Sequence, residues 1–160
     1  AYMGAFIRDR YSLPYVTIGL LLSGFGIGGL LYSASVKSLV RHLGERGLVL
    51  SGGCLVGCCY WFIPSFSDWR LFIPGTILTG LGFYMLHSTL QTQATELSPE
   101  SRGTAVSLFA FSLFLGQGLG AAALGHIVDR FGYPACFILS GIAVTFLTIR
   151  FVSQMPSLKR

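Results

Sequence analysis

The chain has 160 residues, of which 52% are hydrophobic and only 11% are charged. Soluble domains of this size usually carry about 25% charged residues, so the composition excludes an ordinary water-soluble fold. The net charge is +5 at pH 7, but the basic residues form no cluster typical of a nucleic-acid-binding protein.

Uncharged stretches of membrane-spanning length follow one another along the chain. They cover residues 11–36, 47–67, 71–95, 103–128 and 131–149. A helix that crosses the hydrocarbon layer needs about 20 apolar residues, so the pattern predicts an all-α, polytopic membrane helical bundle. Five complete transmembrane helices are expected near residues 15–36, 47–64, 70–95, 102–128 and 132–152.

The first residues, "AYMGAFI" (1–7), look like the end of a sixth helix. The chain begins with Ala, and it lacks the sequence of basic, apolar and small-residue regions that marks a signal peptide. We therefore interpret the sequence as a fragment of a longer protein.

Prolines mark the expected helix ends, where a missing backbone N–H costs least. They are Pro14, Pro64, Pro74, Pro99, Pro134 and Pro156. In the loop "ELSPESRG", Ser98 is expected to cap a helix whose first residue is Pro99. Glu100 then lies in the first turn, where the positive end of the helix dipole favours a carboxylate.

The distribution of Lys and Arg predicts the orientation in the membrane. One set of loops holds Arg8, Arg10, Arg70 and Arg130. The other set holds Lys37, Arg41, Arg46, Arg102, Arg150, Lys159 and Arg160. Cytoplasmic loops carry the excess of Lys and Arg, so residues 37–46, residues 96–102 and the C-terminus are expected on the cytoplasmic side.

Small residues recur at intervals of four inside several expected helices. The pairs are Gly24 with Gly28, Gly53 with Gly57, Gly116 with Gly120, and Ala121 with Gly125. In a membrane, this spacing puts small residues on one face and lets helix backbones approach closely. General tight packing explains the pattern, and so do helices that rock against one another, as in a transporter.

The four cysteines do not form a ligand set for a metal. Cys54, Cys58 and Cys59 lie in one expected helix, and Cys136 lies in another. No histidine or second cysteine pair completes a site, so we expect packing residues, no metal and no cofactor.

A polar stripe follows one face of the expected helix at 70–95. Its members recur every three or four residues: Thr76, Gly80, Tyr84, His87, Gln91 and Thr95. Polar side chains are costly against lipid, so the stripe is expected to face protein or water. A lone membrane histidine is often only a packing residue. With Tyr84 and Gln91 on its face, His87 is interpreted as lining a substrate path.

Gln117 lies midway along the expected helix at 102–128 and needs a polar partner, so it either bonds a neighbouring helix or lines the path. All acidic residues fall in or beside loops: Asp9, Glu45, Asp68, Glu96, Glu100 and Asp129. Coupling of transport to protons would therefore use His87 or a group outside this sequence.

Three loop motifs carry a family resemblance. One holds Glu96, Pro99, Arg102 and Gly103, and a second holds Gly125, Asp129, Arg130 and Gly132. These two motifs lie in Leu90–Tyr133. This stretch resembles the tenth-to-eleventh-helix region of the major facilitator superfamily, most closely its bacterial drug- and sugar-efflux permeases. The third, "LVRHLGERG", resembles the hallmark loop of the superfamily at Gly44 and Arg46. It departs from that loop at Lys37, the opening Gly position, and at Arg41, the Asp position.

The resemblance implies that the chain is the end of helix 7 and helices 8 to 12 of a twelve-helix carrier, with a cytoplasmic C-terminus. The N-terminal half of the carrier would be missing. The helix that holds His87 would face the central path, and residues 49–64 and 133–152 would be outermost. The charged loops would hold gate states through Arg41, Gly44, Arg46, Glu96, Pro99, Arg102, Asp129 and Arg130.

We therefore expect a secondary transporter of the bacterial inner membrane that exports small drug- or sugar-like molecules by alternating access, with protons as the coupling ion. It would do no chemistry on its substrate. An importer of a sugar or an organic acid is the alternative. A membrane-embedded enzyme would need convergent polar groups, which only His126 with Asp129 approaches. A structural membrane scaffold is a third alternative, but a scaffold would gain nothing from a polar stripe that is costly against lipid.

Overall fold

The computed structural model describes residues 2–97 and 99–155, and these residues are helical almost throughout. The elements in chain order are α1 (Met3–Tyr11), α2 (Tyr15–Phe62), η1 (Ile63–Ser65), η2 (Trp69–Leu71), α3 (Phe72–Glu96), η3 (Pro99–Ser101) and α4 (Arg102–Gln154), where η marks a short 3₁₀ helix. By length and composition, α2, α3 and α4 are each long and apolar enough to cross a membrane. The all-helical class is thus confirmed, and the helices fit a membrane bundle.

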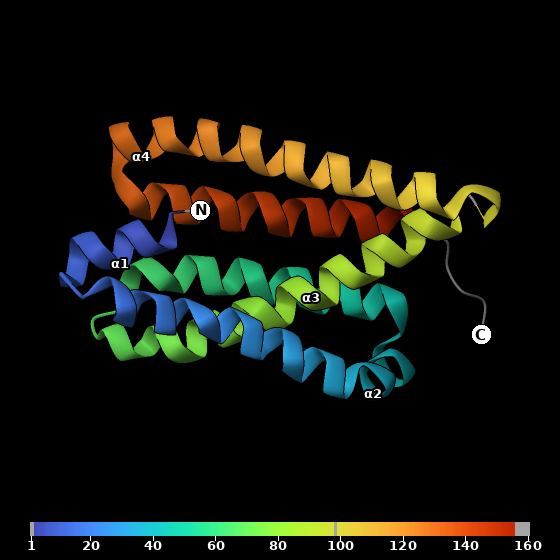
Figure 1. Cartoon of the computed structure of the whole chain (residues 1–160), viewed down its shortest axis with the longest axis horizontal. Coiled ribbons are helices and arrows are strands. Elements are labelled where there is room, and N and C mark those ends of the chain that lie inside the picture. Colours follow the sequence, from blue (N-terminus) through green and yellow to red (C-terminus); the bar gives the residue numbers. More distant parts are fainter. Residues whose placement is uncertain (1, 98, 156–160) are drawn as a thin grey trace.

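A single glycine interrupts each of the two longest helices. Gly44 in α2 has φ 63° and ψ 177°, and Gly132 in α4 has φ 79° and ψ 173°. Positive φ strains residues that have a Cβ, so glycine suits both positions. The chain reverses direction within α2 and within α4 (Figure 1). Each helix therefore consists of two segments, 15–43 and 45–62 in α2, and 102–131 and 133–154 in α4.

The stretch expected to be a loop at 37–46 is helical on both sides of Gly44. Lys37 and Arg41 extend the first segment of α2 beyond its apolar part, and both are exposed. Long basic side chains can keep their charge in water while their stems lie along a helix, so the helix continues past the end of the apolar stretch. The predicted cap at Ser98 lies outside the described residues. Pro99 begins η3, and α4 itself starts at Arg102.

The bundle has two ends, which Figure 1 shows on the left and on the right. α1, the turn from residue 63 to 71 and the reversal within α4 lie at the left end, whereas the reversal within α2 and the start of α4 after η3 lie at the right end. α3 packs mainly against both segments of α2 and touches α4 much less. The side of α3 that faces α4 is therefore the loosely packed side of the bundle.

A buried apolar cluster fixes α1 at the left end. Its fully packed members are Phe6, Ile7, Ile18, Leu21, Ile63, Phe72 and Phe137. The Phe6 ring lies 5.3 Å from that of Phe137 in α4 and 6.1 Å from that of Phe72 in α3. The Tyr2 hydroxyl also donates a hydrogen bond to the Ala121 carbonyl at 2.6 Å. α1 is thus attached to both segments of α4 and to α3.

Glycines allow the backbones of α2 and α3 to touch. A Cβ on Gly28 would overlap the carbonyl oxygen of Ile77, and a Cβ on Gly80 would overlap that of Phe25. Gly53 and Gly57 lie equally close to Thr148 and Thr145 of α4. The close approach expected at the pairs Gly24/Gly28 and Gly53/Gly57 is therefore confirmed. A Cβ on Gly116 or Gly120 would meet nothing within 4 Å outside the local helix among the described residues, whereas one on Gly125 would meet the Tyr2 hydroxyl.

We expect Gly28→Ala to destabilise the bundle, because its new methyl group would force α2 and α3 apart. Overpacking of this kind typically costs about 1–3 kcal/mol. Gly26→Ala is the matched control, since a Cβ at Gly26 meets nothing within 4 Å. Equilibrium unfolding of the full-length protein in mixed micelles would measure both variants. Equal stability of the two would show that the contact at Gly28 is not as close as described.

Candidate functional site

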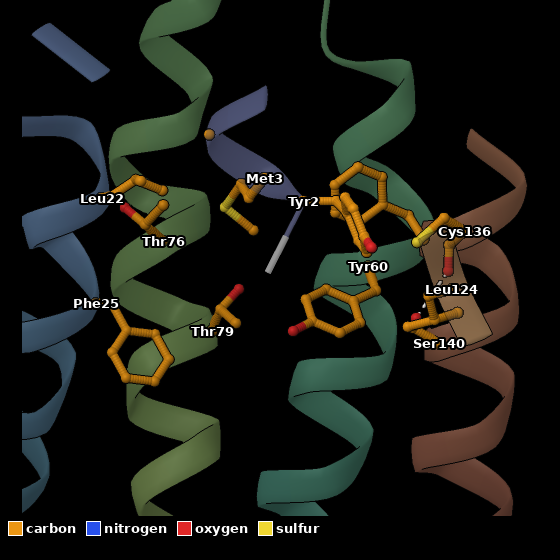
Figure 2. A pocket seen from close by; sticks show the side chains of 12 residues that line it. Tyr2, Met3, Leu22, Phe25, Tyr60, Thr76, Thr79, Leu124, Cys136 and Ser140 are labelled. Carbon is orange, nitrogen blue, oxygen red and sulfur yellow. Dashed lines mark hydrogen bonds between the residues drawn. The ribbon is translucent and has the colours of Figure 1, made fainter. Parts of the chain in front are cut away.

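A pocket of about 400 Å³ lies inside the left end of the bundle, and every long helix contributes to its wall. Met3 comes from α1 and Tyr2 directly precedes it, whereas Leu22, Phe25 and Tyr60 come from α2 (Figure 2). The other lining residues are Gly4, Thr76, Thr79, Leu124, Cys136, Phe137 and Ser140. We call it the left pocket.

Hydroxyl groups provide most of the polarity of the left pocket. Thr79 donates to the Gly75 carbonyl at 2.7 Å, and Ser140 donates to the Cys136 carbonyl at 2.7 Å. These hydroxyls are thus already bonded within their own helices. The Tyr60 hydroxyl points into the pocket opposite Thr79 (Figure 2). It has no hydrogen-bond partner in the described part of the chain, so it is available to a bound molecule.

The structure divides the predicted polar stripe into two parts. Thr76 is buried, and its hydroxyl lies 2.8 Å from the Leu21 carbonyl of α2, while Gly80 contacts the backbone of Phe25. This first part therefore belongs to the interface between α2 and α3, although Thr76 also lines the left pocket.

The second part of the stripe consists of Tyr84, His87 and Gln91, which are half-buried. None of their side chains has a hydrogen bond to another described residue. They lie in the middle and second half of α3, which runs from Phe72 to Glu96. Because unpaired polar groups are costly inside a membrane, these three side chains are candidates to face water or a solute.

Aromatic rings connect three helices beside this second part. Phe25 of α2 lies 5.3 Å from Phe83 of α3, Phe83 stacks on His87 at 5.3 Å, and His87 lies 5.4 Å from Phe109 of α4. The planes of Phe83 and His87 differ by only 9°. We call these four residues the aromatic row. All four are half-buried, so part of each ring remains accessible.

The aromatic row joins two pockets. Phe25 lines the left pocket, and Phe109 lines a pocket of about 360 Å³ at the right end, between the end of α3 and the start of α4. Its other lining residues are Ala94, Leu97, Ser101, Thr104, Ala105, Leu108 and Ser112. The aromatic row therefore lies between residues that line the two pockets, and His87 is its polar member at mid-length of α3.

Gln117 is not among the lining residues of either of these two pockets. It is exposed on the first segment of α4, on a stretch where a Cβ added to Gly116, Gly118 or Gly120 would meet nothing within 4 Å outside the local helix among the described residues. The structure therefore shows no partner for the Gln117 amide within the described ranges.

The predicted loop residues separate into the two ends of the bundle. Arg41, Gly44, Arg46, Glu96, Pro99 and Arg102 lie at the right end, and Asp129 and Arg130 lie beside Gly132 at the left end. Arg46 is half-buried, and its buried Nε atom has no hydrogen-bond partner among the described residues. Arg41, Arg102, Asp129 and Arg130 are exposed.

Two hydrogen bonds at the helix ends were missed by sequence reasoning. Gln93 Nε2 donates to Glu45 Oε2 at 3.0 Å, which connects the turn at Gly44 to the end of α3. At the left end, the Tyr133 hydroxyl donates to Asp9 Oδ2 at 2.9 Å and connects α4 to α1. No sequence spacing marks either pair, because the partners are far apart in the chain.

Phe25, Phe83 and Phe109 were also missed. Phe83 is not a member of the predicted stripe, but its ring stacks on that of His87. Phe83 precedes His87 by four residues, so one turn of α3 brings the two rings together, and this spacing could have revealed the pair. Phe25 and Phe109 carry no such signal, since phenylalanine is common on every face of an apolar helix.

Comparison with known proteins identifies the family. The family model of the Major Facilitator Superfamily matches residues 1–160. An uncharacterized MFS-type transporter of Burkholderia mallei (strain SAVP1) is 36% identical over 135 residues, which are 82% of this chain and 31% of the relative. A second uncharacterized MFS-type transporter, YceJ of Bacillus subtilis (strain 168), is 26% identical over 127 residues, which are 79% of this chain and 33% of the relative.

The chain spans about a third of the length of these relatives. No solved structure matches it. The match of the family model along the whole chain, the similar transporters and the long apolar helices agree with one another. The chain is a multi-pass membrane protein that belongs to the major facilitator superfamily of transporters.

Proposed function

We propose that the chain is one half of a twelve-helix secondary transporter that exports small organic molecules, drug- or sugar-like, by alternating access. In this proposal, α1 is the end of helix 7. The segments 15–43 and 45–62, α3, and the segments 102–131 and 133–154 are helices 8 to 12. The N-terminal half of the carrier would complete the substrate path, and the bacterial inner membrane would be its location.

The observation that carries the proposal is the unpaired polar part of the stripe. Tyr84, His87 and Gln91 are half-buried without side-chain hydrogen bonds to described residues, in a helix long and apolar enough to cross a membrane. His87 is a member of the aromatic row, whose residues Phe25 and Phe109 line the pockets at the two ends of the bundle. A transporter needs polar groups at this depth, because a solute must be bound midway between the two sides.

Protons are the proposed coupling ion, and His87 is the group of this half that would carry them. Histidine is the side chain whose charge changes most readily near neutral pH. Every acidic side chain lies near a helix end or in a turn: Asp9, Glu45, Asp68, Glu96, Glu100 and Asp129. Within the described ranges, His87 is therefore the titratable group best placed at mid-length of α3.

Gating is proposed for the residues at the helix ends. Glu45 and Gln93 form a hydrogen bond at the right end, beside the half-buried Arg46. The exposed residues Arg41, Glu96 and Arg102 surround this end and would meet the other half of the carrier. Gly44 and Pro99 set the chain direction there, and Asp129 and Arg130 would act at the opposite side of the membrane.

Substitution of His87 tests the substrate path. In the full-length carrier, His87→Ala should change relative export rates across a panel of compounds by about 2- to 10-fold, the worth of one hydrogen bond. Expression should remain near normal, because the ring is only half-buried. His126→Ala is the matched control, since His126 is exposed on α4. Export that is unchanged at every pH tested, or changed equally by both variants, would refute a role of His87 in the path.

The orientation has its own test, which relies on the excess of Lys and Arg at the right end. We expect a membrane-impermeant thiol reagent added from outside to label Ser67→Cys and to spare Ser101→Cys. Both positions are exposed, and they lie at opposite ends of the bundle. The background should lack Cys54, Cys58, Cys59 and Cys136. Labelling of the second position alone would mean that the protein has the reverse orientation.

A further inference from the structure

We infer that the aromatic row is the substrate-binding surface of this half and selects flat aromatic molecules that carry no fixed positive charge. The inference rests on the proposed transport function and specifies its substrate class. The row consists of Phe25, Phe83, His87 and Phe109, which come from α2, α3 and α4.

The exposure of the row distinguishes it from an ordinary aromatic core. The left end of the bundle holds a comparable cluster of rings, but there Phe6, Phe72 and Phe137 are only 4%, 0% and 5% exposed. Every ring of the aromatic row is half-buried instead. Rings that serve only to join helices gain most when they are fully covered, so the accessible rings of the row are suited to contact a further ring.

The position of the row gives it access to solutes. Phe25 lines the left pocket and Phe109 lines the pocket at the right end, so the row lies between the two. A solute that moves along this side of α3 from one pocket to the other passes the four rings. The row also lies at mid-length of α3, the depth at which an alternating-access carrier binds its substrate.

The chemistry of the row favours a flat ring. An aromatic pair gains energy from offset or edge-to-face contact beyond the apolar area it buries. His87 adds ring nitrogens, one of which donates and one of which accepts a hydrogen bond in the neutral form. Since His87 has no hydrogen-bond partner among the described residues, it can bind a polar substituent on the stacked molecule. The half-buried Tyr84 follows Phe83 in the chain, and its ring lies 5.6 Å from that of Phe83.

The charges of the described residues disfavour a cationic substrate. The acidic side chains lie at helix ends or in turns, whereas the ring of His87 lies against the rings of Phe83 and Phe109. A fixed positive charge at this depth would therefore have no carboxylate of this half to pair with. An unpaired charge is costly away from water, so a neutral ring is favoured, and a carboxylate can at least accept a hydrogen bond from the His87 N–H, which a fixed cation cannot do.

A pair of probes with similar shape tests the inference. Naphthalene-2-carboxylate and its saturated analogue decahydronaphthalene-2-carboxylate differ mainly in aromaticity, and their binding to the full-length carrier in detergent can be measured by equilibrium dialysis. We expect the aromatic probe to bind about 2- to 12-fold more tightly, as an aromatic contact would give. Phe109→Leu and Phe83→Leu should each reduce this ratio towards one. Phe114→Leu should leave the ratio unchanged, because Phe114 lies outside the row and is 67% exposed on α4, the helix that also holds Phe109.

The remaining outcomes each decide a part of the inference. A ratio near one in the unsubstituted carrier, or no binding of either probe, would overturn it even if both leucine variants failed to fold. Tighter binding of the cation N-methylquinolinium than of naphthalene-2-carboxylate would overturn the charge selection. If His87→Ala alters export of other compounds while the probe ratio is one, the proposed transport function stands and only the aromatic selection fails.

Discussion

The backbone contact between α2 and α3 is the constraint on which the candidate site depends. Gly28 meets the carbonyl of Ile77, and Gly80 meets that of Phe25, so the two helices touch in a register that puts a glycine at each close contact. That register places the Phe25 side chain beside Phe83 and next to the left pocket. In a membrane, such packing replaces the hydrophobic effect as the force that holds helices together. The aromatic row is therefore a result of glycine positions one turn away from it.

The contact between α3 and α4 is loose, in contrast to the close packing of α3 against α2. α3 packs closely against α2, whereas it touches α4 much less, and residues of α3 and α4 line both pockets together. A helix held firmly on one side and open on the other can keep its geometry while its open side exchanges partners. This division of roles suits a protein in which one surface must remain in place while a path opens and closes.

The sequence was sufficient for the helical class and for the family, because both depend on properties that follow the chain locally. The uncharged stretches give the apolar lengths, and the charged loops give the family motifs. The polar stripe could also be recognised, since its period follows from the geometry of a single helix. The sequence could not show that the stripe divides into two parts. The packed part holds Thr76 and Gly80, and the unpaired part holds Tyr84, His87 and Gln91. That division depends on where α2 crosses α3.

Apart from the pair Phe83 and His87, the aromatic row was beyond sequence reasoning for the same reason. Phe25 and Phe109 are remote from His87 in the chain, and each lies in a helix with several other phenylalanines or leucines on all faces. Only the rotation of each helix about its axis decides which ring turns inward. The hydrogen bonds of Glu45 with Gln93 and of Asp9 with Tyr133 depend likewise on how the helix ends meet.

The reversals at Gly44 and Gly132 have a consequence for the order of folding. Each takes a single non-helical residue, so the two segments of α2, and likewise those of α4, are joined by a very short connection. Contacts between chain neighbours form faster than distant ones, because closing a short loop costs less entropy. The hydrogen bond from Thr76 to Leu21, in contrast, joins residues 55 positions apart. We therefore expect the two hairpins to form early and α3 to dock between them last, so that the substrate path exists only in the final step of assembly.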